Sequence, residues 1–408
     1  MQLVVFDDGR AELSPLTDFR AVFDVRTGAL TTLERHEADL GLHVSALFVP
    51  ESIASLTGER HDVLINRLDL GATSLLLING GCPLLPEEAR ELAIGSAVVS
   101  GNDGRLIAAR VGPESALVLL KGGSVDSVKG IQVTVAESHT LLDRPWEVIA
   151  ALDMALRFDL DLIARHRKRG PLPEGVTVIG SAERVFLHPD AEIYPGVVIN
   201  VEDGPVAISS GSEVMPGSVL FGPCSIGRDC VVHPNTVVRS QTSLGPHCKI
   251  AGEVAACIFQ GYANKAHEGF IGHSFVGEWV NFGAGTNGSN LLNTYSQISA
   301  TAQPGGAPEP TGQSFLGAII GDHVKFAIGS RISTGSVLHA GSMFAVSTFI
   351  GGCVGGFMWA TEAGDSVYRF DRWVDTMRLV MSRRGLEPGQ AYLERARVLH
   401  AQASAVEA

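Results

Sequence analysis

Beyond residue 170, apolar residues recur at every sixth position. One run has eight members: Ile208, Val214, Leu220, Ile226, Val232, Val238, Leu244 and Ile250. A second run comprises Ile320, Phe326, Ile332, Leu338, Phe344 and Ile350, and a short one Leu187, Ile193 and Ile199. A period of six fits neither a helix nor a plain amphipathic strand. It is typical of the hexapeptide repeat of a left-handed parallel β-helix, in which each hexad places one side chain inside. We therefore predict such a β-helix over residues 178–355.

Residues 1–168 show a different pattern, in which short apolar runs alternate with amphipathic stretches. This alternation predicts an α/β domain. The expected strands lie at 3–6, 46–50, 74–80, 96–101, 104–111 and 115–121. The expected helices lie near 16–35, 85–93 and 145–166. A Gly/Pro-rich break at 167–175 marks the boundary with the repeats.

The C-terminal segment returns to helical spacing. Residues 366–404 predict two helices, broken at the Gly-Leu-Glu-Pro-Gly stretch 385–389. Because a repeat protein buries its core only by stacking, its ends need caps. We expect these helices to act as a cap or a packing arm.

Composition narrows the range of functions. The net charge is −13 and charged residues make up 18% of the 408-residue chain, which argues against nucleic acid as a partner. No apolar run is long enough for a membrane span, and the N-terminus lacks a secretion signal, so we expect a cytoplasmic protein without membrane partners. The six cysteines include no Cys-x-x-Cys pair, so no metal site is predicted. Cys224, Cys230 and Cys248 share one phase of the repeat, and we interpret them as interior side chains.

Polar residues cluster where the six-residue period slips, over 251–319. The stretch Gly-Glu-Trp-Val-Asn-Phe-Gly-Ala-Gly-Thr-Asn-Gly-Ser-Asn (277–290) resembles the acetyltransferase half of the bifunctional bacterial enzymes that acetylate glucosamine 1-phosphate and then uridylate it. The resemblance covers roughly residues 185–350. The whole chain is more similar still to a group of sugar nucleotidyltransferases related to those enzymes, which share a terminal Val-Met-Ser-Arg-Arg helix (380–384).

The resemblance implies specific roles. His267 matches the catalytic histidine, and Asn281 opens the Asn-x-Gly-Ala-Gly-Thr motif. Asn290 matches an asparagine near the acyl-CoA and the substrate, while Gly329 and Ser330 would line the CoA side. The family also implies acetyl-CoA as the acyl donor, an amino sugar phosphate or sugar nucleotide as acceptor, and a homotrimer with the site between adjacent β-helices.

The chemistry can also be argued from the residues. Acyl transfer to an amine needs a base, which a near-neutral histidine supplies, and donors for the oxyanion, which asparagine amides and backbone N–H groups supply. The alternative for His267 is a corner histidine bonded to a neighbouring carbonyl. For His273 we expect a structural or substrate-contact role.

Departures from the family motif concern the substrate. A tyrosine three residues after the catalytic histidine is Phe270 here, and a sugar-phosphate lysine is replaced near Ala255. Lys265 could compensate, and Lys325 and Arg331 are further basic candidates. The acceptor therefore stays open between glucosamine 1-phosphate and other amines.

The N-terminal domain resembles sugar-phosphate nucleotidyltransferases, with Arg20 and Asn79 as candidate nucleotide contacts. However, Asp7 and Asp8 occupy the loop where phosphates should bind, and Gly81 replaces the aspartate that binds Mg²⁺. We expect the fold to be kept and the usual chemistry lost, although Asp7 and Asp8 leave a rearranged Mg²⁺ site open.

Three hypotheses follow. The first is an acyl-CoA-dependent N-acyltransferase with His267 as base. The second is an active sugar-1-phosphate nucleotidyltransferase whose β-helix serves assembly. The third is a noncatalytic scaffold that binds a sugar nucleotide.

Overall fold

The computed structural model describes residues 1–166 and 170–406. Contacts divide the chain into two compact units. Unit 1 holds residues 1–13, 19–25 and 30–143, and unit 2 holds residues 14–18, 26–29 and 144–408. Within the described ranges, no helix is long and apolar enough to cross a membrane.

Unit 1 is a seven-stranded sheet with helices on both faces. The strand order is β3-β2-β1-β4-β6-β5-β7, and only β6 runs antiparallel to its neighbours. The strands are β1 (Gln2–Phe6), β2 (Val44–Phe48), β3 (Leu64–Ile65), β4 (Leu75–Asn79), β5 (Ser96–Ser100), β6 (Leu106–Val111) and β7 (Gln132–Ala136). The helices are η1 (Val22–Asp24), α1 (Thr32–Leu40), α2 (Glu51–Arg60), η2 (Glu87–Ala89), α3 (Pro113–Leu120) and η3 (Val125–Ser127).

Each face of this sheet has its own core. Leu3 and Val5 of β1 pack with Leu33 of α1 and Ile53 of α2. Val4 and its neighbours on the other face pack with residues of α3. Alternate residues of β1 thus face opposite layers, as a pleated strand between two helical layers requires.

Two sequence predictions in unit 1 were wrong. The run 115–121 is not a strand but lies largely in α3, because Pro113 follows the extended Gly112 and occupies the first helical turn. The stretch 16–35 is not one helix; it holds η1 and only the start of α1, which begins after the capping box of Thr31 and Glu34. In addition, α2 and the edge strand β7 were not predicted.

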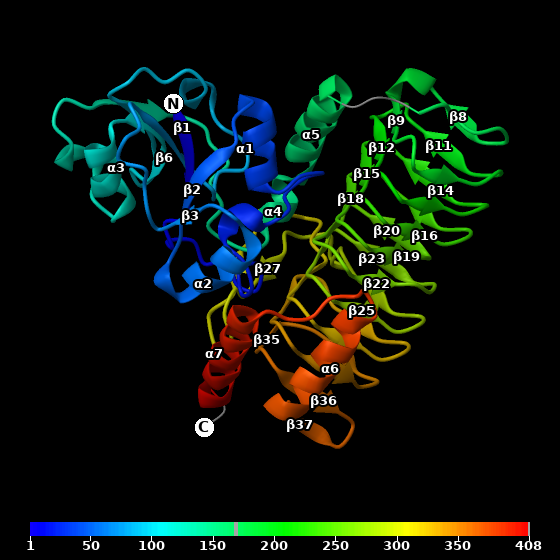
Figure 1. Ribbon diagram of the computed structural model, residues 1–408. Coiled ribbons are helices and arrows are strands. Elements are labelled where there is room, and N and C mark those ends of the chain that lie inside the picture. Colours follow the sequence, from blue (N-terminus) through cyan, green and yellow to red (C-terminus); the bar gives the residue numbers. More distant parts are fainter. Residues whose placement is uncertain (167–169, 407–408) are drawn as a thin grey trace. The chain divides into compact units, whose positions relative to one another are not determined.

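Unit 2 is built around a three-sided parallel β-helix, whose coils form the stacked rows of strands in Figure 1. The first face comprises β10 (Glu192–Ile193), β13 (Glu213–Val214), β16 (Val231–Val232), β19 (Lys249–Ile250), β22 (Asn264–Lys265), β25 (Asn281–Phe282), β30 (Lys325–Phe326), β33 (Met343–Ala345), β36 (Met358–Thr361) and β37 (Gly364–Val367).

The second face comprises β8 (Thr177–Ile179), β11 (Val198–Asn200), β14 (Val219–Phe221), β17 (Val237–Val238), β20 (Glu253–Ala255) and β23 (Phe270–Gly272). A separate sheet contacts it through β23 and holds β26 (Asn287–Gly288), β31 (Arg331–Ile332) and β34 (Phe349–Ile350).

The third face comprises β9 (Val185–Leu187), β12 (Val206–Ile208), β15 (Cys224–Ile226), β18 (Thr242–Leu244), β21 (Ile258–Phe259), β24 (Phe275–Val276), β29 (Ala318–Ile320), β32 (Ser336–Leu338) and β35 (Cys353–Val354). A long excursion between β26 and β29 carries the antiparallel pair β27 (Ser299–Ala300) and β28 (Glu309–Pro310).

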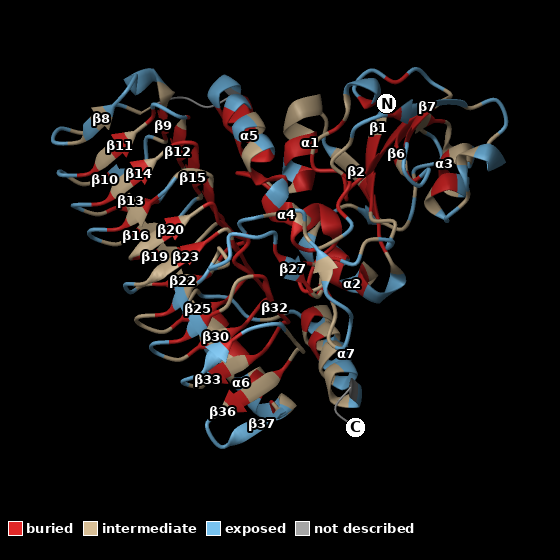
Figure 2. Cartoon of the chain, turned by 180° about the vertical axis from the view of Figure 1, so that it is seen from behind, coloured by how far each residue is buried: buried red, intermediate tan, exposed pale blue. Residues whose placement is uncertain are grey.

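The hexad residues form the core of this β-helix. Every member of the three apolar runs is buried there, which Figure 2 shows as buried strands along the coils. Cys224, Cys230 and Cys248 lie in the same core as free thiols, so their interpretation as interior side chains is confirmed. The predicted fold class, an α/β domain followed by a left-handed parallel β-helix and terminal helices, is confirmed.

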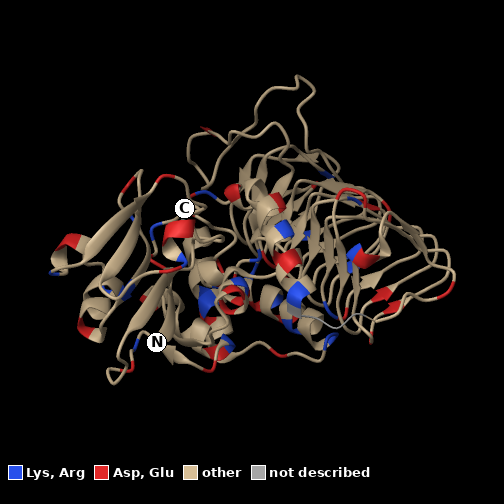
Figure 3. Ribbon diagram, turned by 90° about the horizontal axis from the view of Figure 1, so that it is seen from above, with Lys and Arg blue, Asp and Glu red and all other residues tan. Residues whose placement is uncertain are grey.

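The helices of unit 2 are α4 (Glu147–Ala150), α5 (Leu152–His166), η4 (Ala182–Arg184), α6 (Phe370–Ser382) and α7 (Gln390–Val406). Helix α5 contacts β12 and β15, and residues 144–166 therefore group with unit 2. The domain boundary at 168 stays a prediction. Residues 167–169 of the predicted break lie outside the described residues. Charged residues are spread thinly along the ribbon, in keeping with the composition (Figure 3).

Candidate functional site

His267 lies on the turn between β22 and β23, and its side chain is exposed. The turn is fastened from inside the β-helix by Lys265, whose side chain is 1% exposed. Its Nζ donates to the carbonyl oxygens of Ala251 at 2.7 Å and of His267 itself at 3.0 Å. Burial lowers the pKa of Lys265 to about 8. The ammonium thus holds the backbone that presents the imidazole.

The next coil of the β-helix has only glycine and alanine residues beside this turn. Gly283, Ala284 and Gly285 form its corner, and the amide of Gly285 donates to the carbonyl of Glu268 at 3.3 Å. A Cβ on Gly283 would lie 2.5 Å from backbone atoms of the next coil, so only glycine permits this close stacking. The result is a smooth strip of backbone next to His267.

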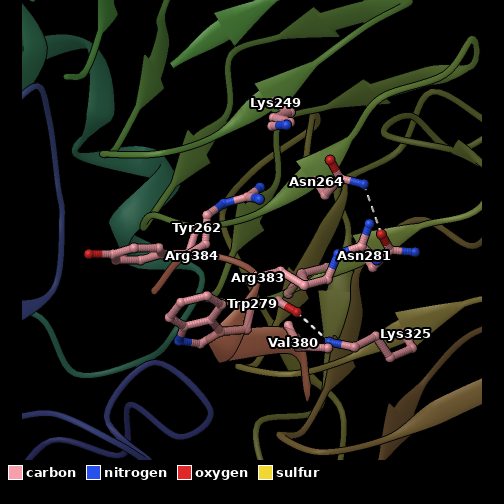
Figure 4. A pocket seen from close by; sticks show the side chains of 10 residues that line it. Lys249, Tyr262, Asn264, Trp279, Asn281, Lys325, Val380, Arg383 and Arg384 are labelled. Carbon is pink, nitrogen blue, oxygen red and sulfur yellow. Dashed lines mark hydrogen bonds between the residues drawn. The ribbon is translucent and has the colours of Figure 1, made fainter. Parts of the chain in front are cut away.

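Asn281 precedes that corner and pairs with Asn264 on the adjacent strand. The two residues are in register, and Asn264 Nδ2 donates to Asn281 Oδ1 at 2.9 Å. Both line a pocket of about 340 Å³ on the outer face of the strands β19, β22, β25 and β30 (Figure 4). One predicted catalytic residue therefore lines this pocket, and His267 is not among its lining residues.

His273 and Asn290 form a separate pair. The amide Nδ2 of Asn290 lies 2.8 Å from His273 Nδ1, and the His273 ring stacks on Phe315 with centroids 5.0 Å apart. Burial lowers the pKa of His273. With Nδ1 accepting from the amide, the neutral imidazole carries its proton on Nε2.

Gly329 and Ser330 face different ways. Gly329 forms an open corner whose amide donates to Ala284 O at 2.7 Å, so it continues the smooth strip. Ser330 is 1% exposed, and its hydroxyl donates to Ala327 O at 2.8 Å. The hydroxyl predicted to line the CoA side is therefore turned inward, where it closes its own corner.

In unit 1, Asp7 and Asp8 follow the carboxyl end of β1, Asn79 ends β4, and Arg20 lies just before η1. Asn79 Nδ2 donates to Asp8 Oδ2 and to Leu106 O, both at 3.0 Å, and Asn79 Oδ1 accepts from the amide of Gly81 at 2.9 Å. Every polar atom of the Asn79 amide thus has a protein partner. Arg20 is 1% exposed, which leaves its guanidinium little surface for a ligand.

The two loop carboxylates are likewise occupied by protein groups. Asp7 accepts from the amides of Val22 and Gly9, and burial raises the pKa of Asp7. Asp8 lies 3.7 Å from the guanidinium of Arg105. In the ranges 1–166 and 170–406, no group of three His, Cys, Asp or Glu side chains is placed to hold a metal ion.

Sequence reasoning missed most of the residues that line the pocket of Asn281. Lys249 and Lys325 occupy the same outward register as Asn264 and Asn281, a signal that the strand pairing of a β-helix could have supplied. Arg383 and Arg384 come from the terminal Val-Met-Ser-Arg-Arg segment, which was noticed without a function being assigned.

Parts of the chain are similar in sequence to known proteins. Residues 3–168 match the family model described as sugar nucleotidyl transferase. A bifunctional sugar-1-phosphate nucleotidylyltransferase/acetyltransferase of Sulfurisphaera tokodaii is 30% identical over 143 residues, which are 33% of this chain and 35% of that protein. A bifunctional protein GlmU of Legionella pneumophila (strain Corby) is 40% identical over 150 residues, 31% of this chain and 32% of that protein.

The chain spans about a third of the length of these curated relatives. Among solved structures, a hexapeptide transferase family protein from Anaplasma phagocytophilum is similar at 14% identity with a TM-score of 0.28, over 54% of this chain and 95% of that one. The chain is thus similar to sugar nucleotidyl transferases over residues 3–168, and about a third of it is similar to bifunctional nucleotidyltransferase/acetyltransferase proteins.

Proposed function

We propose that the protein is a transferase that moves an acyl group from acetyl-CoA to the amine of an amino sugar phosphate or a sugar nucleotide. The observation that carries this proposal is the exposed imidazole of His267 on a turn fastened by Lys265, beside the smooth corner of Gly283 and Gly285. The similarity to the bifunctional sugar-1-phosphate nucleotidylyltransferase/acetyltransferase of Sulfurisphaera tokodaii supports the same class of reaction.

In the proposed step, a proton passes from the acceptor nitrogen to His267 and then from the His267 imidazolium to the leaving CoA thiolate. The acceptor amine attacks the thioester carbonyl, a C–N bond forms, and the imidazole of His267 takes the proton that the nitrogen loses. The C–S bond then breaks, and the CoA thiolate leaves and is protonated. Backbone N–H groups and the Asn281 amide are the donors available for the oxyanion. The side-chain-free corners would let the pantetheine arm lie against the backbone.

The other predicted residues take roles that follow from their contacts. Lys265 is a positioning residue, because its ammonium holds the carbonyl of His267. Asn290 fixes the tautomer and orientation of His273 through its amide. Gly329 extends the smooth strip toward the CoA side.

A homotrimer is part of this proposal. The side chains of Ile328 and Phe349 are 79% and 63% exposed, and Ile328 belongs to the same corner as Gly329. A neighbouring β-helix that covered them would bury apolar surface and close the open strip beside His267.

An acetyl-transfer assay tests the proposal. The release of free CoA thiol from acetyl-CoA is followed with glucosamine 1-phosphate and with a UDP-linked amino sugar as acceptors. We expect amine-dependent thiol release by the wild type and by His43→Ala, whose histidine is fully exposed on unit 1. We expect its loss in His267→Ala. Equal rates in both variants would refute His267 as the base.

The family match of residues 3–168 favours a second activity, nucleotidyl transfer by unit 1. The carboxylates of Asp7 and Asp8 and the amide of Asn79 are engaged with protein groups, which counts against it. Pyrophosphate release from UTP or dTTP with hexose 1-phosphates, dependent on Mg²⁺, would establish this activity, and its absence would leave unit 1 without catalysis.

A further inference from the structure

The pocket on the outer face of the β-helix is unusually basic. Its ten lining residues are Lys249, Tyr262, Asn264, Trp279, Val280, Asn281, Lys325, Val380, Arg383 and Arg384. Four of them are cationic residue types and none is a carboxylate, in a chain whose net charge is −13. Like charges gathered at one place repel one another unless an anion compensates them.

Three of the four basic side chains form no ion pair with an acidic residue in the described parts of the chain, while Asp322 interacts electrostatically with Lys325. Among residues 1–166 and 170–406, neither Lys249 nor Arg383 nor Arg384 pairs with a carboxylate. Lys325 donates from Nζ to the carbonyl oxygen of Trp279 (Figure 4). The positive charge of the pocket is therefore left for a ligand to neutralise.

Two rigid elements bring these charges together. Lys249 and Lys325 project from β19 and β30, and the register places Asn264 and Asn281 between them on the same outward row. The arginines stand at the end of α6, which is anchored by the buried side chains of Trp373, Met377 and Met381. A favourable interaction with the helix C-terminus could account for the arginines alone, but not for the lysines of the facing strands.

One wall of the pocket is aromatic. Tyr262 and Trp279 stack with ring centroids 4.3 Å apart, on successive coils. The stack continues to His247 and His323, so it forms a rigid wall of the pocket. The guanidinium groups of arginine match phosphate oxygens in geometry and charge.

We propose that this pocket binds the diphosphate group of a small organic molecule, with Arg383, Arg384 and Lys249 neutralising its charge. The amide of Asn264, which pairs with Asn281 on the adjacent strand, would donate to its oxygens. Three cationic side chains, those of Lys249, Arg383 and Arg384, around about 340 Å³ match a diphosphate better than a single carboxylate. Both a sugar nucleotide and CoA carry this group, and the site does not depend on His267 being catalytic.

Direct binding to the full chain tests the inference. Inorganic pyrophosphate is titrated by calorimetry into the wild type, into the double variant Arg383→Gln/Arg384→Gln, and into Arg378→Gln. Arg378 is an exposed arginine of the same helix that does not line the pocket. We expect the double variant to raise the Kd at least tenfold and Arg378→Gln to leave it unchanged. Equal affinities in all three proteins, or no binding by the wild type, would overturn the proposal.

Competition experiments identify which molecule carries the bound diphosphate. Displacement of pyrophosphate by UDP points to a sugar nucleotide, and displacement by CoA points to the acyl donor; displacement by neither would refute an organic diphosphate. If the double variant does not fold, Lys249→Gln on the strand side replaces it, with the same expected loss of affinity. His267→Ala should bind pyrophosphate normally, so failure of acyl transfer and failure of this site can be told apart.

Discussion

At the scale of single residues, the most informative side chain is Lys265. It stands in register with the core residue Ile250, at a position where the repeat calls for an aliphatic side chain. A lysine buried there costs free energy because its ammonium leaves water, and two carbonyl contacts offset only part of that cost. We infer that the residue is kept for the turn that presents His267.

The lowered pKa of Lys265 makes stability depend on pH. Its pKa is about 8 in the folded protein against an ordinary value of 10.5. Between these values the unfolded chain binds the additional proton, so the free energy of unfolding should rise with pH, by roughly 2 kcal/mol from pH 8 to pH 10. Urea unfolding of the wild type and of Lys265→Met at both pH values measures this.

The comparison with Lys265→Met removes the contribution of other groups that titrate in the same range, Lys325 among them. From pH 8 to pH 10, the free energy of unfolding of Lys265→Met should rise by roughly 2 kcal/mol less than that of the wild type. An identical rise in both proteins would mean that Lys265 is not a buried cation in solution.

At the scale of elements, the glycine corners of the coils shape the surface beside His267. Gly283 lies against the backbone of the next coil, whereas Gly329 has open space where a Cβ would be placed. Gly283→Ala should therefore force two coils apart and destabilise the protein by about 2–4 kcal/mol. Gly329→Ala should cost only about 1 kcal/mol, from its positive φ. Thermal unfolding compares the two, and a larger loss for Gly329→Ala would contradict the stacking described for Gly283.

Some of the helices and strands could be predicted from the sequence, and others could not. The six-residue period identified the core residues of the β-helix because each hexad contributes one inward side chain, a local rule. The run at 115–121 has no clear alternation, so its helical state was decided by Pro113 and by packing on the sheet. Lys265 interrupts the six-residue period and was interpreted as a ligand contact. The residues next to it in the sequence do not indicate that its side chain points into the β-helix.

The basic pocket was beyond sequence reasoning for a related physical reason. Its lysines and asparagines lie 15 to 44 residues apart along the chain and meet only through strand register. Its arginines arrive on α6, whose place against the strands depends on tertiary packing of Trp373. The sequence pointed to Asn281, to Lys325 as a basic candidate and to the Val-Met-Ser-Arg-Arg segment, but not to their meeting in one pocket.

At the scale of the whole molecule, the account predicts assembly. We expect sedimentation equilibrium to give three chain masses for the wild type. Ile328→Asp should shift the distribution to lower mass, because a charge would be buried between neighbouring β-helices. Ile94→Asp, at a similarly exposed position of unit 1, is the matched control and should remain trimeric. A monomeric wild type would contradict the proposal that a neighbouring β-helix closes the site.

The role of His267 as the base of acyl transfer can be tested by steady-state kinetics combined with a binding measurement. Steady-state acetyl transfer and the Kd for acetyl-CoA are measured for the wild type and His267→Asn. The account predicts that kcat falls by about 10²–10⁴-fold while the Kd for acetyl-CoA stays unchanged. An unchanged kcat in His267→Asn would contradict it.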